Sequence, residues 1–261
     1  MSSKLVTLRV WGDFACFTRP EMKVERVSYP VMTPSAARGI LEAIFWEPQM
    51  HYLVDAIRIV KRGNWIALRR NEITKTIDLR AYARLNPVQA GGGAEDGTQR
   101  NMLALREVEY LITAEIRLTP LASPGRDSIS KYGAELERRA GQGKCFHRPG
   151  LGMREFAADF DWEADADATL RRRCQELGAS PENFNEDLGL MLYDLFDHRE
   201  RQQGFRWLPA PSPSIRSQPW EGRRIVPSPA FFRARVQNSV LDCHPERVKV
   251  LTRDAATVQP S

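Results

Sequence analysis

Alternation of apolar and polar side chains, interrupted by two helical segments, constrains the fold of the first 165 residues more than any other feature. Strands are predicted where the alternation has a period of two, as in ALREVEYLITAEIRL. In chain order they cover residues 4–12, 51–61, 64–73, 104–118 and 153–162. The second and third of these strands could pair as a hairpin. With the helices, the order is β, α, β(β), β, α, β, the split β-α-β arrangement of ferredoxin-like domains.

Both helices carry signals at their ends. The helix predicted over residues 33–46 begins with Thr33 as N-cap and Pro34 at the first helical position. Glycines follow the helix predicted over residues 128–140. We therefore expect the α+β fold class, with a ferredoxin-like domain over residues 1–165. Because many unrelated proteins share this arrangement, RNA-recognition modules among them, it does not settle the function.

The rest of the chain is predicted to form a smaller unit. A short helix is expected over residues 167–178. Strands broken by prolines are expected over residues 187–197, 204–211 and 223–238. Together they predict a helix and a small antiparallel β module over residues 166–244. The tail, 245–261, lacks a core-forming pattern and is expected to be loose, and the turn-rich segment 86–101 is expected to be mobile.

Charge is distributed unevenly, although the formal net charge of +5 is modest. Residues 121–154 contain seven Lys and Arg against three Asp and Glu. Residues 155–200 contain four Arg against thirteen Asp and Glu. This asymmetry favours an anionic ligand near the first of the two segments.

Several classes of protein find no support in the sequence. The four cysteines are scattered without CxxC spacing, so we expect no structural metal and no cofactor. No signal pattern is present and no apolar run approaches ~18 residues, so we expect a cytoplasmic protein without a membrane partner. The missing motifs for nucleoside triphosphates, serine nucleophiles and dinucleotides disfavour kinases, hydrolases and dehydrogenases.

The basic stretch SKYGAELERRAGQGKCFHRPG, residues 130–150, has two interpretations. It can be a solvated helix and loop in which Glu135 pairs with Lys131 one turn away. It can also bind phosphates, because Lys131 and Arg138 share a helix face and the glycines let backbone N–H groups approach closely. Candidates for nucleic-acid contact along the chain are Arg19, Arg69, Arg70, Arg138, Arg139, Lys144, Arg148 and Arg154.

Five segments occur together in the order in which one known family has them. They are WGDFACFTRPEMKVERVSYPVMTPSAARGILEAIFWEP, RRNEI, QRNMLALREVEYLITA, KYGAELERRAGQGKCFHRPGLGMREF and DLGLMLYDL. From Arg9 to Asp194 the chain thus resembles the d subtype of the fifth CRISPR-associated (Cas) subunit, from type I-C systems. The resemblance implies a ferredoxin-like, RNA-recognition-type domain of the RAMP superfamily, followed by a small C-terminal β module.

The resemblance also implies an activity and partners. Such a protein cleaves precursor CRISPR RNA at the repeat stem-loop without a metal. It then stays on the 5′ handle of the product, among the other subunits of the type I-C surveillance complex. Other subtypes bind RNA without cutting it, so the alternative is a non-catalytic scaffold that holds the handle. The same basic surface could also bind duplex DNA, because phosphate contacts alone do not distinguish nucleic acids.

Family members that cleave are assigned a Tyr–Lys–His set, which this chain matches only in part. Lys131 occupies the lysine position, and we expect it to stabilise the charged phosphorane. Tyr132 replaces the histidine, where it could act as base, orient the 2′-OH or donate a proton. Phe45 replaces the tyrosine and can only stack on RNA or pack. His147 is a candidate for the missing acid-base chemistry, or else an RNA-contacting or capping residue.

Overall fold

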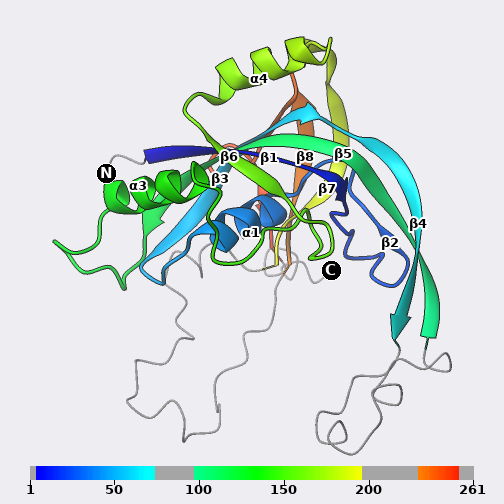
Figure 1. Cartoon of the computed structure of the whole chain (residues 1–261), viewed down its shortest axis with the longest axis horizontal. Helices are drawn as coiled ribbons and strands as arrows, with labels where there is room; N and C mark the ends of the chain where they lie inside the picture. Colours follow the sequence, from blue (N-terminus) through cyan, green and yellow to red (C-terminus); the bar gives the residue numbers. More distant parts are fainter. Residues whose placement is uncertain (1–3, 74–96, 196–228, 253–261) are drawn as a thin grey trace, which may run out of the picture.

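A single long strand organises the sheet. The computed structural model describes residues 4–73, 97–195 and 229–252. The central strands are β1 (Lys4–Ala15), β3 (Met50–Lys61), β4 (Asn64–Ile73) and the 22-residue β5 (Gly97–Leu118). β1 pairs with β5 antiparallel along one edge, and β3 and then β4 pair with it along the other. The protein is a mixed α and β fold on a large antiparallel sheet with few helices (Figure 1).

The predicted hairpin between the second and third strands is wrong. β3 pairs with β5 at residues 109–118, and β4 pairs with β5 at residues 97–106. Gly63 makes the step between them, because its φ is 81° and a Cβ there would lie 2.6 Å from the Arg106 carbonyl oxygen. Beyond the short β2 (Arg26–Val27), the outer ends of β4 and β5 extend together from the rest of the sheet (Figure 1).

The C-terminal strands continue the same sheet. They are β6 (Asp159–Glu163), β7 (Glu186–Asp194), β8 (Ala230–Gln237), β9 (Val240–Asp242) and β10 (Val250–Leu251). The order is β10-β8-β9-β3-β5-β1-β6, with β7 beside β8 and β2 beside β5. β7 and β8 therefore join the first part of the sheet through β9 and β3, and the domain boundaries stay a prediction. Within the segment expected to be a loose tail, residues 250–251 form β10 beside β8, and residues 253–261 lie outside the described residues.

Other predicted segments differ in part. The strand predicted over 153–162 is limited to β6, because the residues before it turn around Gly152. Residues 97–101, expected to be mobile, belong to β5. Outside the described residues lie the predicted strand over 204–211, the turn-rich residues 86–96 and residues 223–228.

Helices cover both faces of the sheet. They are α1 (Pro34–Ile44), α3 (Ile129–Ala140) and α4 (Ala166–Glu176), with a 3-10 turn at Pro181–Asn183. Thr33 caps α1 as predicted. α1 and α3 lie on one face and α4 on the other (Figure 1). Alternation along β5 explains this, since Ile112 joins the core with α1 and α3 whereas Leu111 packs with Leu170 of α4. No helix in the described ranges is both long and apolar enough to cross a membrane.

A buried carboxylate fastens α4 to the sheet. Glu109 of β5 is 5% exposed and accepts a hydrogen bond from Arg9 Nε at 2.7 Å. Arg173 of α4 donates to the same carboxylate through Nε at 2.8 Å and Nη2 at 2.9 Å. Burial alone would raise the pKa of Glu109, but the hydrogen bonds from Arg173 and Arg9 outweigh it and the pKa lies below its ordinary value.

Replacing this carboxylate should destabilise the fold. We expect Glu109→Gln to lower the free energy of unfolding by about 3 kcal/mol, because two arginines lose their buried partner. Since the folded-state pKa is depressed, the contribution is present above the ordinary value of 4.5 and is lost as pH falls through the folded pKa. Urea unfolding at pH 7 and below pH 4 measures both effects.

Glu107→Gln is the matched control for this experiment. Glu107 lies two residues away on β5 and pairs with Lys61 at 2.7 Å, but it is exposed. We expect a much smaller change from this variant. Equal destabilisation by the two variants would contradict the role of Glu109.

Candidate nucleic-acid interface

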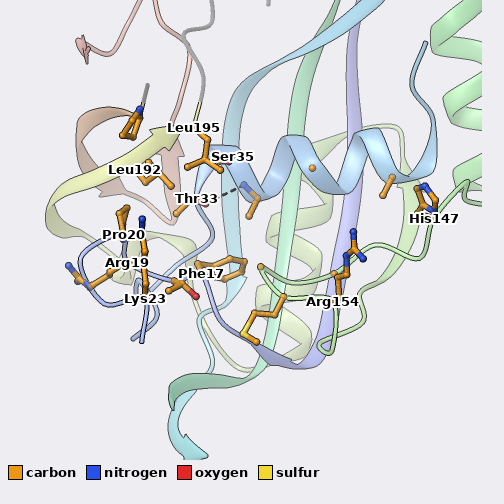
Figure 2. A pocket seen from close by; sticks show the side chains of 18 of the residues that line it. Phe17, Arg19, Pro20, Lys23, Thr33, Ser35, His147, Arg154, Leu192 and Leu195 are labelled. Carbon is orange, nitrogen blue, oxygen red and sulfur yellow. Dashed lines mark hydrogen bonds between the residues drawn. The ribbon is translucent and has the colours of Figure 1, made fainter. Parts of the chain in front are cut away.

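A groove of about 920 Å³ runs beside α1 with basic residues toward both ends of the helix. Arg19 and Lys23, from the loop after β1, lie near the first turn of α1 (Figure 2). Arg154 and His147, from the segment before β6, lie toward the last turn, and Arg148 also lines the cavity. No Asp or Glu among the described residues lines it. We call this cavity the basic groove.

Two loops far apart in sequence form one wall of the basic groove. The Cys16 N–H donates a hydrogen bond to the Leu151 carbonyl at 3.0 Å. Gly152 has a φ of 84°, and a Cβ there would lie 2.2 Å from the Cys16 carbonyl oxygen. Only glycine allows this approach, which holds the loop carrying Arg154 against the residues that follow β1.

An ion pair fixes α1 against β7. Arg38 donates to Asp194 through Nε at 2.9 Å and through Nη2 at 3.1 Å, a bidentate geometry that defines orientation as well as distance. Arg38 also pairs with Glu42 on the next turn of α1. Leu192 and Leu195, beside Asp194, line the basic groove. The ion pair therefore sets the spacing between two of its walls.

The cations of the basic groove are only partly neutralised. Arg19 and Arg148 each lie 3.7 Å from one exposed carboxylate. Lys23 and Arg154 form no ion pair with any residue that the structure describes. Exposed ion pairs of this kind are weak, so the groove presents an excess of positive charge.

The two arginines predicted on β4 occupy different surroundings. Arg70 Nη1 lies 3.8 Å from Sδ of Met153, which lines the basic groove, and Arg70 also pairs with Glu72 and Glu155. Arg69 is the neighbouring residue of the strand and so projects to the other face, where it is exposed. The structure thus brings Arg70, and not Arg69, to the edge of the groove.

A second cavity, of about 610 Å³, lies at the start of α3. Lys131 lines it with 56% of its side chain exposed. Its Nζ donates to the Arg126 carbonyl at 3.1 Å and lies 3.9 Å from Asp127 Oδ1. The N-cap Ser128 accepts the Lys131 backbone N–H at 3.2 Å, which fixes the first turn. We call this cavity the Lys131 pocket.

The arginines of α3 form hydrogen bonds and ion pairs with other groups of the same chain. Arg138 Nη2 and Arg139 Nε donate to Glu135 Oε1 at 2.8 and 2.7 Å. These hydrogen bonds, that of Arg138 first, lower the pKa of Glu135 to about 2. Arg139 also donates to the Ile44 carbonyl at 3.3 Å and lies 5.0 Å from the centre of the Phe45 ring. The prediction that Glu135 pairs with Lys131 is wrong, because its partners are the two arginines.

Tyr132 and Phe45 are interior residues of the Lys131 pocket, 4% and 5% exposed, with ring centres 6.0 Å apart. The Tyr132 O–H donates to Asp127 Oδ1 at 2.7 Å. Burial, followed by this contact with Asp127, raises the pKa of Tyr132 to about 12. The phenol is therefore protonated at neutral pH, which disfavours the base role among the three considered. Phe45 was expected either to stack on RNA or to pack, and its buried ring packs beside Tyr132.

The comparisons with known proteins agree over almost the whole chain. The family model described as CRISPR-associated protein (Cas_Cas5) matches residues 5–244. The chain belongs to this family. A relative from Mannheimia succiniciproducens, named CRISPR pre-crRNA endoribonuclease Cas5d, is 36% identical over 92% of this chain and 95% of its own length. One of the same name from Thermus thermophilus is 38% identical over 94% of each chain.

Solved structures share the fold. A structure titled crystal structure of CRISPR-associated protein superposes with a TM-score of 0.57 and 19% identity, covering 96% of this chain and 97% of the other. A functionally uncharacterized protein from Streptococcus mutans superposes with a TM-score of 0.54 and 19% identity, covering 96% and 98%. At this identity the likeness concerns the fold alone.

The structure separates the three candidate catalytic residues. Lys131 and Tyr132 line the Lys131 pocket, whereas His147 lines the basic groove. Lys131 and Arg139 are eight residues apart on α3, which is about 12 Å along the helix axis. The loop to His147 follows the end of this helix at Ala140. The His147 N–H donates to the Ala43 carbonyl at 2.9 Å, at the end of α1. The hydrogen bond fits the capping alternative for His147, and both RNA contact and a part in acid-base chemistry stay predictions.

Sequence reasoning missed several polar residues of these sites, among them Lys23, Asp127 and Arg126. Lys23 lies alone in a loop, and nothing in its sequence neighbourhood marks it. Asp127 precedes the N-cap Ser128, and an acidic residue near a helix N-terminus is a signal that could have been used. Within the described ranges, no three His, Cys, Asp or Glu side chains gather as they would around a metal ion. The expectation of chemistry without metal or cofactor stays a prediction.

The state of Tyr132 can be tested by titration. In protein labelled with ¹³C at tyrosine Cζ, we expect the Tyr132 resonance to stay constant up to about pH 10.5, because its pKa is about 12. Asp127→Asn should lower that pKa toward 10, since a neutral amide replaces the neighbouring charge. Tyr132→Phe assigns the signal. A wild-type resonance that titrates below pH 10 would contradict this description.

Proposed function

We propose that this chain is an endoribonuclease that cleaves precursor CRISPR RNA at the repeat stem-loop without a metal. It then stays on the 5′ handle of the product as a subunit of the type I-C surveillance complex. The observation that carries the proposal is the identity of 36% and 38%, over more than nine-tenths of each chain, to relatives named pre-crRNA endoribonucleases. The two cavities support it, since one offers unpaired cations for a phosphate backbone and the other an exposed lysine.

We further propose that the N-terminal part is a ferredoxin-like domain of the RNA-recognition type. The strand order β6-β1-β5-β3, all antiparallel, supports it, because this is how a split β-α-β unit arranges its four strands. The position of α1 and α3 on one face of that sheet agrees with it (Figure 1).

The proposed reaction is an intramolecular transesterification. The ribose 2′-OH loses its proton, and the oxygen attacks the adjacent phosphorus. The bond from phosphorus to the 5′ oxygen then breaks, and that oxygen takes up a proton from water in place of the one the 2′-OH released to water, which leaves a 2′,3′-cyclic phosphate and a 5′-OH. Holding the 2′-OH in line with the phosphate supplies part of the rate. The ammonium of Lys131 stabilises the negative charge that develops on the phosphorane.

We assign Tyr132 a positioning role in this reaction. Its O–H donates a hydrogen bond to Asp127, so the lone pairs of its oxygen remain to accept a hydrogen bond from the ribose 2′-OH. The pairing of Asp127 with Tyr132, Lys131 and Arg126 fixes these three groups around one carboxylate. We propose that His147, Arg19, Arg148 and Arg154 contact the RNA in the basic groove.

A non-catalytic scaffold is the second candidate. Phe45 and Tyr132 replace two members of the Tyr–Lys–His set, which favours a chain that binds the handle without cutting. Binding of duplex DNA in the basic groove is a further candidate, because the cations of the groove would contact phosphates, which RNA and DNA share.

Replacement of Lys131 separates the first two candidates. In EDTA, with a labelled repeat RNA and excess protein, we expect Lys131→Ala to cut at least about 100-fold more slowly than wild type, because one donor to the transition state is lost. Its affinity for the RNA should change little. Lys249→Ala, an exposed lysine that lines neither cavity, is the matched control and should cut normally. Wild-type protein that binds the repeat but never cuts it would establish the scaffold instead.

The basic groove predicts a salt dependence. Lys23→Ala and Arg154→Ala should each weaken RNA binding and lower the slope of log Kd against log salt concentration by about 0.7, the value for one phosphate of a single strand. Arg171→Ala is the control, because this exposed arginine lies on α4, across the sheet from the groove. Unchanged slopes in both groove variants would place the RNA elsewhere. Equal competition by unrelated duplex DNA would support the third candidate.

A further inference from the structure

Phe146 is an apolar side chain that the fold leaves in water. It is 74% exposed, more than any other large hydrophobic residue in the part of the chain that the structure describes. The residues around it in the loop are no apolar patch, since Lys144, His147 and Arg148 are exposed as well. An apolar surface for a protein partner would need several such side chains together. One aromatic ring among cations suits a nucleobase.

The backbone of Phe146 is held firmly although its ring is exposed. Its N–H is shared between the Ala43 carbonyl at 3.0 Å and the Ile44 carbonyl at 3.3 Å. The next N–H, that of His147, also donates to the Ala43 carbonyl. The His147 ring stands edge-on to the Phe146 ring, with centres 4.4 Å apart and planes at 68°. A ring supported in this way loses little conformational freedom when a base stacks on it.

Phe146 lies where the two cavities meet. Arg139, which lines the Lys131 pocket, donates to the Ile44 carbonyl, to which the Phe146 N–H also donates. His147, the next residue, lines the basic groove. An RNA strand that occupies both cavities therefore passes the end of α1, where the backbone of Phe146 is held.

We propose that Phe146 is a stacking platform for one unpaired base of the RNA, between the nucleotides bound in the basic groove and the one cut in the Lys131 pocket. This inference rests on the proposed function and adds a positioning residue to it. By holding that base, Phe146 fixes how far the strand advances toward Lys131. It contacts no reacting atom, so its loss affects binding and register more than the chemistry of a correctly placed RNA.

Three variants of Phe146 test the proposal on the full-length chain and a repeat RNA made uncleavable by a 2′-deoxy ribose. We expect Phe146→Ala to bind about 5- to 100-fold more weakly, the range for loss of one base–aromatic stack. Phe146→Leu should resemble Phe146→Ala, because it keeps apolar area without a ring face. Phe146→Trp should retain affinity, and RNA should quench the emission that this variant adds to wild type. Leu190→Ala removes another exposed apolar side chain, 54% exposed, and should change affinity less than twofold.

An abasic scan, in which one base of the RNA is removed at a time, identifies the stacked base. It also separates stacking from a purely structural role of Phe146, which would not make affinity depend on one particular base. Removing one base at a single position should weaken binding to wild type and leave binding to Phe146→Ala unchanged. If wild type binds and cuts while Phe146→Ala has the same affinity and the same cut position, this inference is overturned and the proposed function stands. Lost binding of a partner subunit with unchanged RNA affinity would also overturn it. If wild type does not bind repeat RNA, both proposals fail.

Discussion

Pairing along β5 is the constraint on which the rest of the structure depends. Its 22 residues hold β1 on one edge and both β3 and β4 on the other, so that segments distant in sequence come into one register. Successive β5 side chains then divide the core: one set packs under α1 and α3, and the other, with Glu109, anchors α4. The surface that carries both cavities is the face on which α1 and α3 lie.

α1 links the two cavities on that face. Its first turns and one side border the basic groove, and the carbonyls of its last turn hold Arg139 from α3 and the loop with Phe146 and His147. Carbonyls in the last turn of a helix have no hydrogen-bond partner within the helix, so they attract cations and N–H donors from elsewhere. Arg38 fastens the middle of the same helix to β7. Binding and cleavage are thus assigned to neighbouring but separate cavities, with α1 fixing the distance between them.

Local signals predicted the longer elements but not their partners. Thr33 and Pro34 marked the start of α1, and period-two alternation marked the strands, because caps and periodicity are properties of short segments. The pairing of β4 with β5 depends on contacts across some thirty residues and on the step at Gly63, which no local pattern reveals. The family motif pointed to Lys131 because the motif is a short stretch of sequence. It could not show that Lys131 and His147 line different cavities, because that depends on contacts between distant segments.

The central claim is that the scissile phosphate lies at the start of α3, in the Lys131 pocket, and not beside His147. A repeat RNA with 2′-deoxy-4-thiouridine as the nucleotide at the mapped cut can be photocrosslinked to the wild-type chain and the attached peptide identified by mass spectrometry. The account predicts attachment within residues 126–132. Attachment within residues 143–154, with none at the start of α3, would contradict it.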